Sequence, residues 1–390
     1  MGKKNIAYIN REMLIWARSQ TPFKDSADDI KRIYPKIDTD KIIRWENGEE
    51  FPSINEVKNI CKIYRVPFAS LYLSEPPKKD PPKYVDRRTY FETEHYKLSY
   101  ELWSEINRVI HDREIALNYL EENVKHNIYD LSKLASENIV ETANKIRSYL
   151  QMPTYYKSKF GQSFNYFRKL IENKNIIVTQ ISDVGLDEMK GLSISEKTLP
   201  IIAVNNRDFS NSKTFSLFHE LAHIIRRSSS LCLIDDNERN DQEEKICDRI
   251  AAEVLMPKNE FIYMANKIFL KYNEWNTISL LALSKKFGVS TVSVFRRLHE
   301  LKFFTDEYYY KEYKKINKDF KEMADTQKKD LLEKNAPIRF PIRYINKHGR
   351  LMPRTVINAY DTGRISFGEV CKTLNVKRKH IDEITRMSAL

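Results

Sequence analysis

The chain has 390 residues, of which 41% are hydrophobic, so we expect two to four domains with sizeable cores. Only 9 glycines stand beside 22 tyrosines and 19 phenylalanines, which favours a helix-rich protein, and the net charge of +12 favours acidic partners. The sequence has no signal peptide, no apolar run long enough to span a membrane and no C-x-x-C pair among its four cysteines, so we expect a cytoplasmic protein with reduced thiols and no membrane partner.

The first 75 residues carry the pattern of a bundle of short helices, in which Ser26 is a predicted N-cap. The string Trp45-Glu46-Asn47-Gly48, followed by Phe51-Pro52-Ser53, resembles the end of the recognition helix in Xre-type helix-turn-helix domains of phage repressors. A proline-rich stretch, 75–82, then leads out of this module. The predicted helices are 13–17, 26–33, 39–46 and 53–64, closed by 66–73.

The charge of this module leaves its use open. Residues 24–56 hold six Lys/Arg and nine Asp/Glu, a net charge of −3. Because phosphate contacts dominate DNA affinity, an acidic recognition region reads DNA poorly, and Asp38 and Asp40 lie where the recognition helix would approach the groove. Two interpretations therefore remain: sequence-specific DNA binding, or a fold kept for protein contact or self-association.

Amphipathic helices are predicted next, at 98–124 and 140–150, in a region that we interpret as a packing spacer. A further helix is expected at 164–173. Three strands follow, at 175–179, 192–194 and 201–204, and predict a small sheet against which the next helix packs.

That next helix carries His-Glu-x-x-His. His219 and His223 lie one turn apart on one helix face, so both imidazoles can bind a single Zn²⁺. Glu220 is placed to take a proton from a water molecule rather than to bind the metal. The flanking residues are apolar, and two buried imidazoles need polar partners, so a metal site is favoured over a chance match.

A second helix offers the third ligand. It spans 243–255 and ends near Pro257. We expect Glu244 to bind zinc and Asp248, one turn later, to accept the free N–H of a ligating histidine. Glu243 competes with Glu244 as ligand, and a solvated acidic face is the other alternative. Two histidines and a carboxylate also suit Mn²⁺ or Fe²⁺.

These residues resemble the ImmA/IrrE family of zinc metallopeptidases over about 160–265. The second helix departs from the family pattern at Cys247, Asp248 and Ile250, which replace Ala, Asn and Phe. Gly191-Leu192-Ser193-Ile194 and 200–206 resemble the strand pair before the family's zinc helix. The resemblance implies a zinc-dependent endopeptidase that cuts a protein, commonly a helix-turn-helix repressor, in a regulatory response. The donor that stabilises the oxyanion stays open among Tyr, His and Arg.

The end of the chain is basic. Residues 278–301 have a second helix-turn-helix pattern around Gly288, which serves either as a packing subdomain for the zinc helices or as a DNA-binding element. From 296 to 390 the chain holds 22 Lys/Arg and 13 Asp/Glu, a net charge of +9. Tyrosines and lysines interleave over 308–318, a pattern that fits either a DNA or other nucleic-acid surface or a solvated helix face. We expect strands around His348-Gly349 within 338–358 and short helices at 365–370 and 376–384, with His348 and His380 as structural or surface residues.

The predicted fold class is α+β and mostly α, with a helix-turn-helix bundle at the N-terminus, a central zincin-like metallopeptidase with a small sheet, and a helical or mixed C-terminal region. The alternative function is a transcription regulator or nucleic-acid sensor in which the peptidase fold is a regulatory module. The predicted domains are an Xre-like domain at 1–75, a proline-rich linker and spacer at 76–155, the metallopeptidase at 156–265, a helix-turn-helix-like subdomain at 266–305, and a basic region at 306–390.

Overall fold

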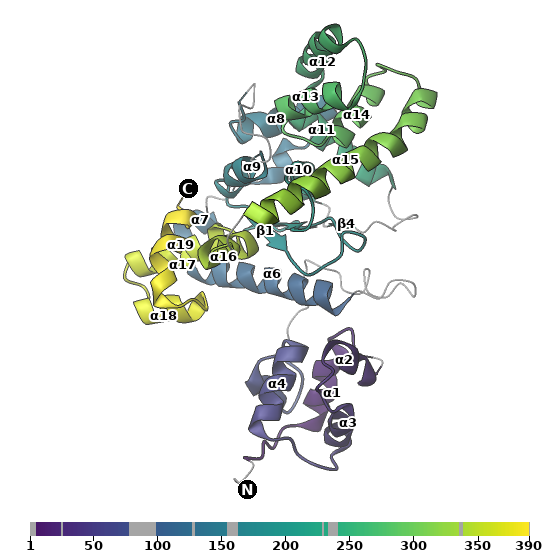
Figure 1. Ribbon diagram of the computed structural model, residues 1–390. Coiled ribbons are helices and arrows are strands. Elements are labelled where there is room, and N and C mark those ends of the chain that lie inside the picture. Colours follow the sequence, from purple (N-terminus) through teal and green to yellow (C-terminus); the bar gives the residue numbers. More distant parts are fainter. Residues whose placement is uncertain are drawn as a thin grey trace. The chain divides into compact units, whose positions relative to one another are not determined.

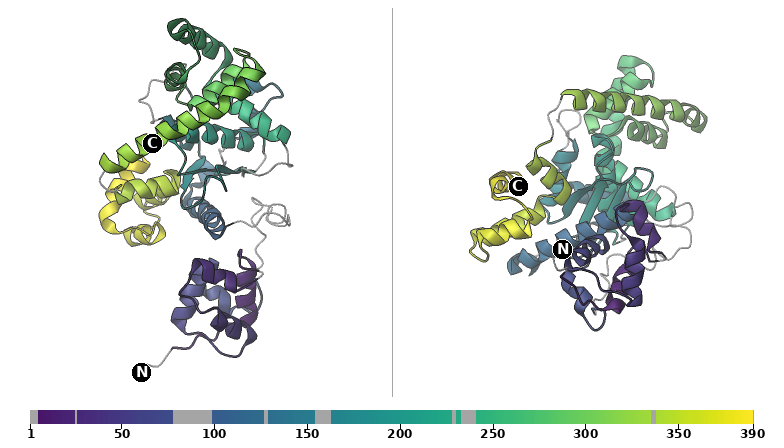
Figure 2. Two further views of the ribbon diagram at one scale, coloured as in Figure 1. Left: turned by 45° about the vertical axis from the view of Figure 1, so that its right-hand side comes forward. Right: turned by 60° about the horizontal axis from the view of Figure 1, so that its bottom comes forward.

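The computed structural model describes residues 5–24, 26–77, 99–126, 129–153, 163–227, 230–232, 241–334 and 338–389. The chain is mostly helical with one small sheet, which confirms the predicted α+β, mostly α class (Figures 1 and 2). It divides into two compact units, Met1–Ile110 and His111–Leu390, and the division falls within helix α6 (Tyr100–Tyr119). The bounds of the five predicted domains remain a prediction.

The first unit is a bundle of short helices whose ends follow the capping signals of the sequence. Ser53 and Glu56 form a capping box at the start of α4, Asp38 caps α3, and Gly48 ends α3 with a φ of 77°. The prediction of Ser26 as N-cap is wrong, because α2 starts at Asp28 and Ala27 is its N-cap; the Ser26 hydroxyl still accepts a hydrogen bond from the backbone N–H of Asp28. The elements are α1 (Arg11–Ser19), α2 (Asp28–Ile33), α3 (Thr39–Asn47), α4 (Ile54–Tyr64) and the 3₁₀ turn η1 (Phe68–Tyr72).

The first turn of α6 belongs to the core of this unit. Tyr100 stacks on Phe23 with ring centroids 5.1 Å apart, and its hydroxyl donates to the carbonyl of Ile63 at 3.1 Å. Trp103 is buried in the same cluster as Leu14. The helix predicted within the spacer therefore starts as part of the N-terminal core, while most of the proline-rich stretch lies outside the described residues.

The second unit contains a four-stranded sheet in the order β1-β3-β2-β4. β1 (Ile177–Ile181) runs parallel to β3 (Ile201–Asn205), and β2 (Gly191–Ile194) lies antiparallel between β3 and β4 (Ser230–Cys232). Every residue of β1, β2 and β3 is buried, because helices cover them. The three predicted strands are confirmed within two residues, whereas β4 was not predicted.

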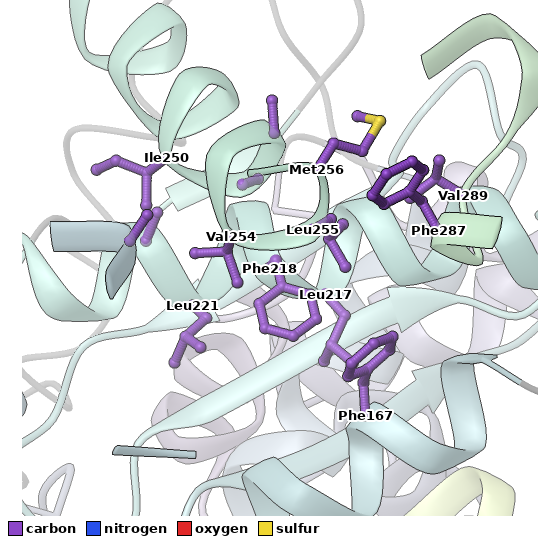
Figure 3. Packing of buried hydrophobic residues seen from close by; sticks show 14 of the residues in the cluster. Phe167, Leu217, Phe218, Leu221, Ile250, Val254, Leu255, Met256, Phe287 and Val289 are labelled. Carbon is purple, nitrogen blue, oxygen red and sulfur yellow. The ribbon is translucent and has the colours of Figure 1, made fainter. Parts of the chain in front are cut away.

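Helix α10 (Ser210–Ile225) packs across β2 and β3 and against α9 (Ser163–Glu172) and α11 (Asp241–Leu255). Figure 3 shows Phe218 and Leu221 of α10 facing Val254 of α11 in a shared core. The predicted spacer contributes to the same core through the turn η2 (Leu131–Leu134) and α8 (Ile139–Tyr149), which packs on α11; α7 (Glu122–His126) precedes them. These spacer residues thus support the site helices directly.

Helices α12 (Lys258–Tyr272), α13 (Thr277–Phe287), α14 (Thr291–Glu300) and α15 (Asp306–Lys334) follow. Gly288, with a φ of 68°, ends α13, and α13 and α14 meet at 95°. Leu280, Phe287 and Phe295 of this pair lie in the same core as α10 and α11. Within the described ranges no single helix is long and apolar enough to cross a membrane. Only α13 and α14, taken together across their bend, have the length and the apolar composition of a membrane span.

The strands predicted within 338–358 are wrong, because this region is helical. Pro341 occupies the first turn of α16 (Phe340–His348), where proline favours helix formation, and Tyr344 and Ile345 follow it at helical spacing on the buried face. Gly349 ends this helix. The remaining elements are α17 (Leu351–Asp361), α18 (Phe367–Thr373), the 3₁₀ turn η3 (Arg378–His380) and α19 (Ile381–Ser388).

Both isolated histidines of this region have structural contacts. His348 lies 2.9 Å from a carboxylate oxygen of Asp112 and stacks on Tyr344, while His380 packs on Phe340. Neither contact involves the helices that carry the His-Glu-x-x-His motif.

Candidate metal centre

Helix α10 carries both motif histidines on its buried face. The side chains of His219 and His223 are 11% and 2% exposed, and their Nε2 atoms lie 3.1 Å apart. The apolar neighbours on this helix, Leu217, Phe218 and Leu221, are buried against the sheet and α11. The sequence therefore places the histidine pair on a helix that packing holds in position.

Helix α11 supplies a carboxylate to both rings. The two oxygens of Glu244 lie 3.0 Å from Nε2 of His219 and 3.2 Å from Nε2 of His223. Burial alone raises the pKa of Glu244, but hydrogen bonding with His219 and His223 outweighs it, so its pKa lies well below the usual value. The carboxylate is therefore charged at neutral pH.

Asp248 lies behind His219. Its Oδ1 is 2.9 Å from Nδ1 of His219, on the side of the ring opposite Glu244. In the tautomer in which Nδ1–H donates to Asp248, Nε2 of a neutral His219 has a lone pair that can bind a metal ion. The ring nitrogens of His219 and His223 lie at hydrogen-bond distance from each other and from the Glu244 carboxylate, so a shared proton or a cation can hold the three groups together.

The spacing of these three side chains fits a small tetrahedral metal ion. Metal–ligand distances of about 2.0–2.1 Å in a tetrahedral zinc site place neighbouring ligand atoms about 3.3 Å apart. The two Nε2 atoms are 3.1 Å apart, and each lies 3.0 or 3.2 Å from one of the two oxygens of Glu244. Three protein ligands leave a fourth position for water or substrate, which is the arrangement of catalytic rather than structural zinc sites.

Glu243 has another partner. It forms a two-pronged ion pair with Arg226, at the end of α10, with distances of 2.5 and 2.7 Å. Its carboxylate, the Cys247 sulfur and a ring nitrogen of His223 lie within 4.8 Å of one another. The structure thus places Glu244, and not Glu243, against both Nε2 atoms.

Glu220 is 1% exposed and lies between α10 and the sheet. A Cβ atom built on Gly191 of β2 would overlap the Glu220 carboxylate. The sequence carries a weak signal for this contact, since a glycine inside an apolar strand often marks a close approach of another group.

An outer layer of ion pairs comes from α14. Nη1 of Arg296 lies 3.5 Å from the second oxygen of Asp248, and Arg296 is also hydrogen-bonded to Tyr309 of α15. Arg297, which is buried, pairs with Glu253 of α11 and donates to the carbonyl of Met256 at 3.2 Å. No local pattern predicts these pairs, because the partners are more than forty residues apart in sequence.

Residues 172–299 match the family model of the IrrE N-terminal-like domain, Peptidase_M78. The matched segment is shorter than half of the chain, contains all five residues predicted for the site, and extends through α13 and almost to the end of α14. The match supports a metallopeptidase-type function of the ImmA/IrrE kind in general terms. The comparison with curated proteins gives no match.

Proposed function

We propose that this protein is a zinc-dependent endopeptidase in which His219, His223 and Glu244 hold the metal. The observation that carries the proposal is the convergence of two ring nitrogens and both oxygens of one carboxylate, at 3.0–3.2 Å, from two helices that share a core. Asp248 fixes the tautomer of His219 and orients its ring. Zinc bound there supplies a Lewis acid that polarises the scissile carbonyl and lowers the pKa of water toward neutrality.

Glu220 is the proton carrier of this proposal. It takes a proton from the attacking water and passes it to the leaving amine, which allows one carboxylate to serve as base and then as acid. Its burial keeps bulk solvent away from the carboxylate. The substrate follows from the family resemblance: a protein, and within that class a helix-turn-helix transcriptional repressor, cut in a regulatory response in the cytoplasm.

Zinc content and peptide cleavage test the proposal together. We expect one zinc per wild-type chain, lost in His219→Ala and Glu244→Ala and retained in the neighbouring control Glu243→Gln. Glu220→Gln should keep the zinc and lose about 10²–10⁴-fold in cleavage of a peptide library read by mass spectrometry. A wild-type protein without zinc after zinc is supplied, or full cleavage by Glu220→Gln, would contradict the mechanism.

A nucleic-acid partner is a second proposal, supported by helix α15. Its first turns expose Lys311, Lys314, Lys315 and Lys318 together with Tyr310, which is 71% exposed. Exposed lysines contact phosphates and an exposed tyrosine stacks on bases, so this face suits DNA or RNA without sequence preference. Under this proposal the nucleic acid signals to the peptidase, or the peptidase fold serves as the regulatory module of a nucleic-acid sensor.

A further inference from the structure

The contact between Gly191 and Glu220 has no explanation in backbone conformation. The φ of Gly191 lies outside the left-handed region, so any residue could adopt its backbone. The position next to Gly191 is also not an empty space that a larger side chain could fill. A Cβ atom there would overlap Oε1 of Glu220 and lie 3.0 Å from both Cδ and Cγ. The requirement at this position is therefore steric, and Glu220 is the group that imposes it.

The strand cannot give way to a larger residue. Gly191 is paired with Val204 of β3 on one side and with Cys232 of β4 on the other. The backbone of Asn205 also donates to the carbonyl of Lys190 at 2.9 Å, next to this position. Since β2 is held from both sides, an added methyl group must displace the carboxylate of Glu220.

We propose that Gly191 is a positioning residue for Glu220: its missing side chain leaves the volume in which strand β2 and helix α10 hold the proton-carrying carboxylate. The inference rests on the proposed function. Glu220 follows His219 directly in the chain. If its carboxylate is displaced, it moves relative to the proposed metal ligands, while the ligands themselves stay in place. Loss of positioning of this kind lowers the rate of the proton-transfer step more than it weakens substrate or metal binding.

Gly191→Ala in the full-length, zinc-loaded protein is the first arm of the test. We expect kcat to fall at least about tenfold, with KM and zinc content within about twofold of wild type. The matched control is Gly368→Ala, because a Cβ there meets only Ser366 Oγ at 3.8 Å. This control should leave kcat unchanged.

Thermal unfolding of the zinc-free protein provides a second readout. Gly191→Ala should lower Tm by about 2–4 °C, the effect of mild overpacking. The same shift should appear in a Glu220→Gln background, where the side chain keeps its shape, and disappear in a Glu220→Ala background, where the volume is empty. A shift of equal size in the Glu220→Ala background would overturn the proposed contact.

The outcomes separate this inference from the proposed function. A wild-type protein that takes up no zinc removes both the peptidase and the role of Gly191 in it. If wild type has normal zinc content and cleavage and Gly191→Ala has an unimpaired kcat, only the positioning role of Gly191 is refuted.

Discussion

A helix-turn-helix pattern occurs twice in this chain, within residues 1–75 and at 278–301. The helices α3 in the first and α14 in the second use their basic residues differently. On α3 of the first unit, Lys41 pairs with Glu56 at 3.2 Å and Arg44 pairs with Glu50 at 2.8 Å. These partners lie within fifteen residues in sequence, and the side chains are 29–43% exposed. The basic groups of α3 therefore neutralise nearby acids at the surface.

Helix α14 of the second unit pairs its arginines with a distant helix. Arg296 contacts Asp248 and the buried Arg297 contacts Glu253, both on α11, which also carries Glu244. The family match extends from residue 172 to 299 and so includes α13 and α14 together with α10 and α11. A helix-turn-helix pattern in sequence thus predicts helices and a turn, while the partners of the basic residues decide what the pair does.

The largest expected difference between α14 and α3 is the free energy of unfolding that is lost when one of their arginines is replaced. Arg297→Met leaves Glu253 buried without its counter-charge, which costs about 3–5 kcal/mol in free energy of unfolding. Arg44→Met removes a solvent-screened pair at the surface and should cost far less. Chemical denaturation of both variants measures the comparison.

The double variant Arg297→Met/Glu253→Met is the control for the first effect. It should recover much of the lost stability, because it removes both charges instead of leaving one unpaired. If Arg297→Met and Arg44→Met cost the same, α14 is not anchored on α11 by this pair.

The sequence predicts the parts of the site that depend on local spacing. His219 and His223 are one helical turn apart, and Glu244 and Asp248 repeat that spacing on α11, so the two residues of each pair were expected to share a helix face. The structure brings His219, His223 and Glu244 together and places Asp248 behind His219. The helices at 39–46, 53–64 and 278–287 were predicted within one residue of their observed ends, because capping residues mark them.

Contacts that depend on tertiary packing could not be predicted. Sequence alone leaves open which of Glu243 and Glu244 faces the two histidines; in the structure Glu244 does, while Glu243 pairs with Arg226. The close approach of Glu220 to Gly191 depends on the sheet register and on the docking of α10. Strands were expected within 338–358, but Pro341 in the first turn and the buried Tyr344 and Ile345 favour the helix that forms.

A smaller effect concerns the pH dependence of the first unit. Burial raises the pKa of Glu56, but hydrogen bonds from Ser53 and Lys41 outweigh it and lower the pKa to about 2. Because the folded pKa is depressed, the stabilisation is complete above the unfolded pKa of about 4.3 and is lost as pH falls from there toward 2. Glu56→Gln should therefore cost about 1–2 kcal/mol at pH 7 and progressively less below pH 4.5.

Unfolding of wild type and Glu56→Gln across pH 2.5–7 measures this effect, with the exposed Glu49→Gln as the matched control. A cost that stays constant over this pH range would mean that the charge of Glu56 does not stabilise α3 and α4.

The smallest expected effect is that of α3 on nucleic-acid affinity. Lys41 and Arg44 are already paired with carboxylates, and residues 24–56 carry a net charge of −3. The double variant Lys41→Gln/Arg44→Gln should therefore change the affinity of the full chain for duplex DNA by less than about twofold. Replacing Lys311, Lys314, Lys315 and Lys318 of α15 by glutamine should instead weaken binding and reduce the slope of its salt dependence by roughly one for each lysine that binds a phosphate. Gel-shift titrations at several salt concentrations separate the two regions. A large loss of affinity in the α3 variant would show that the first pair binds DNA despite its acidic surroundings, and equal affinity of both variants and wild type would remove the nucleic-acid proposal for α15.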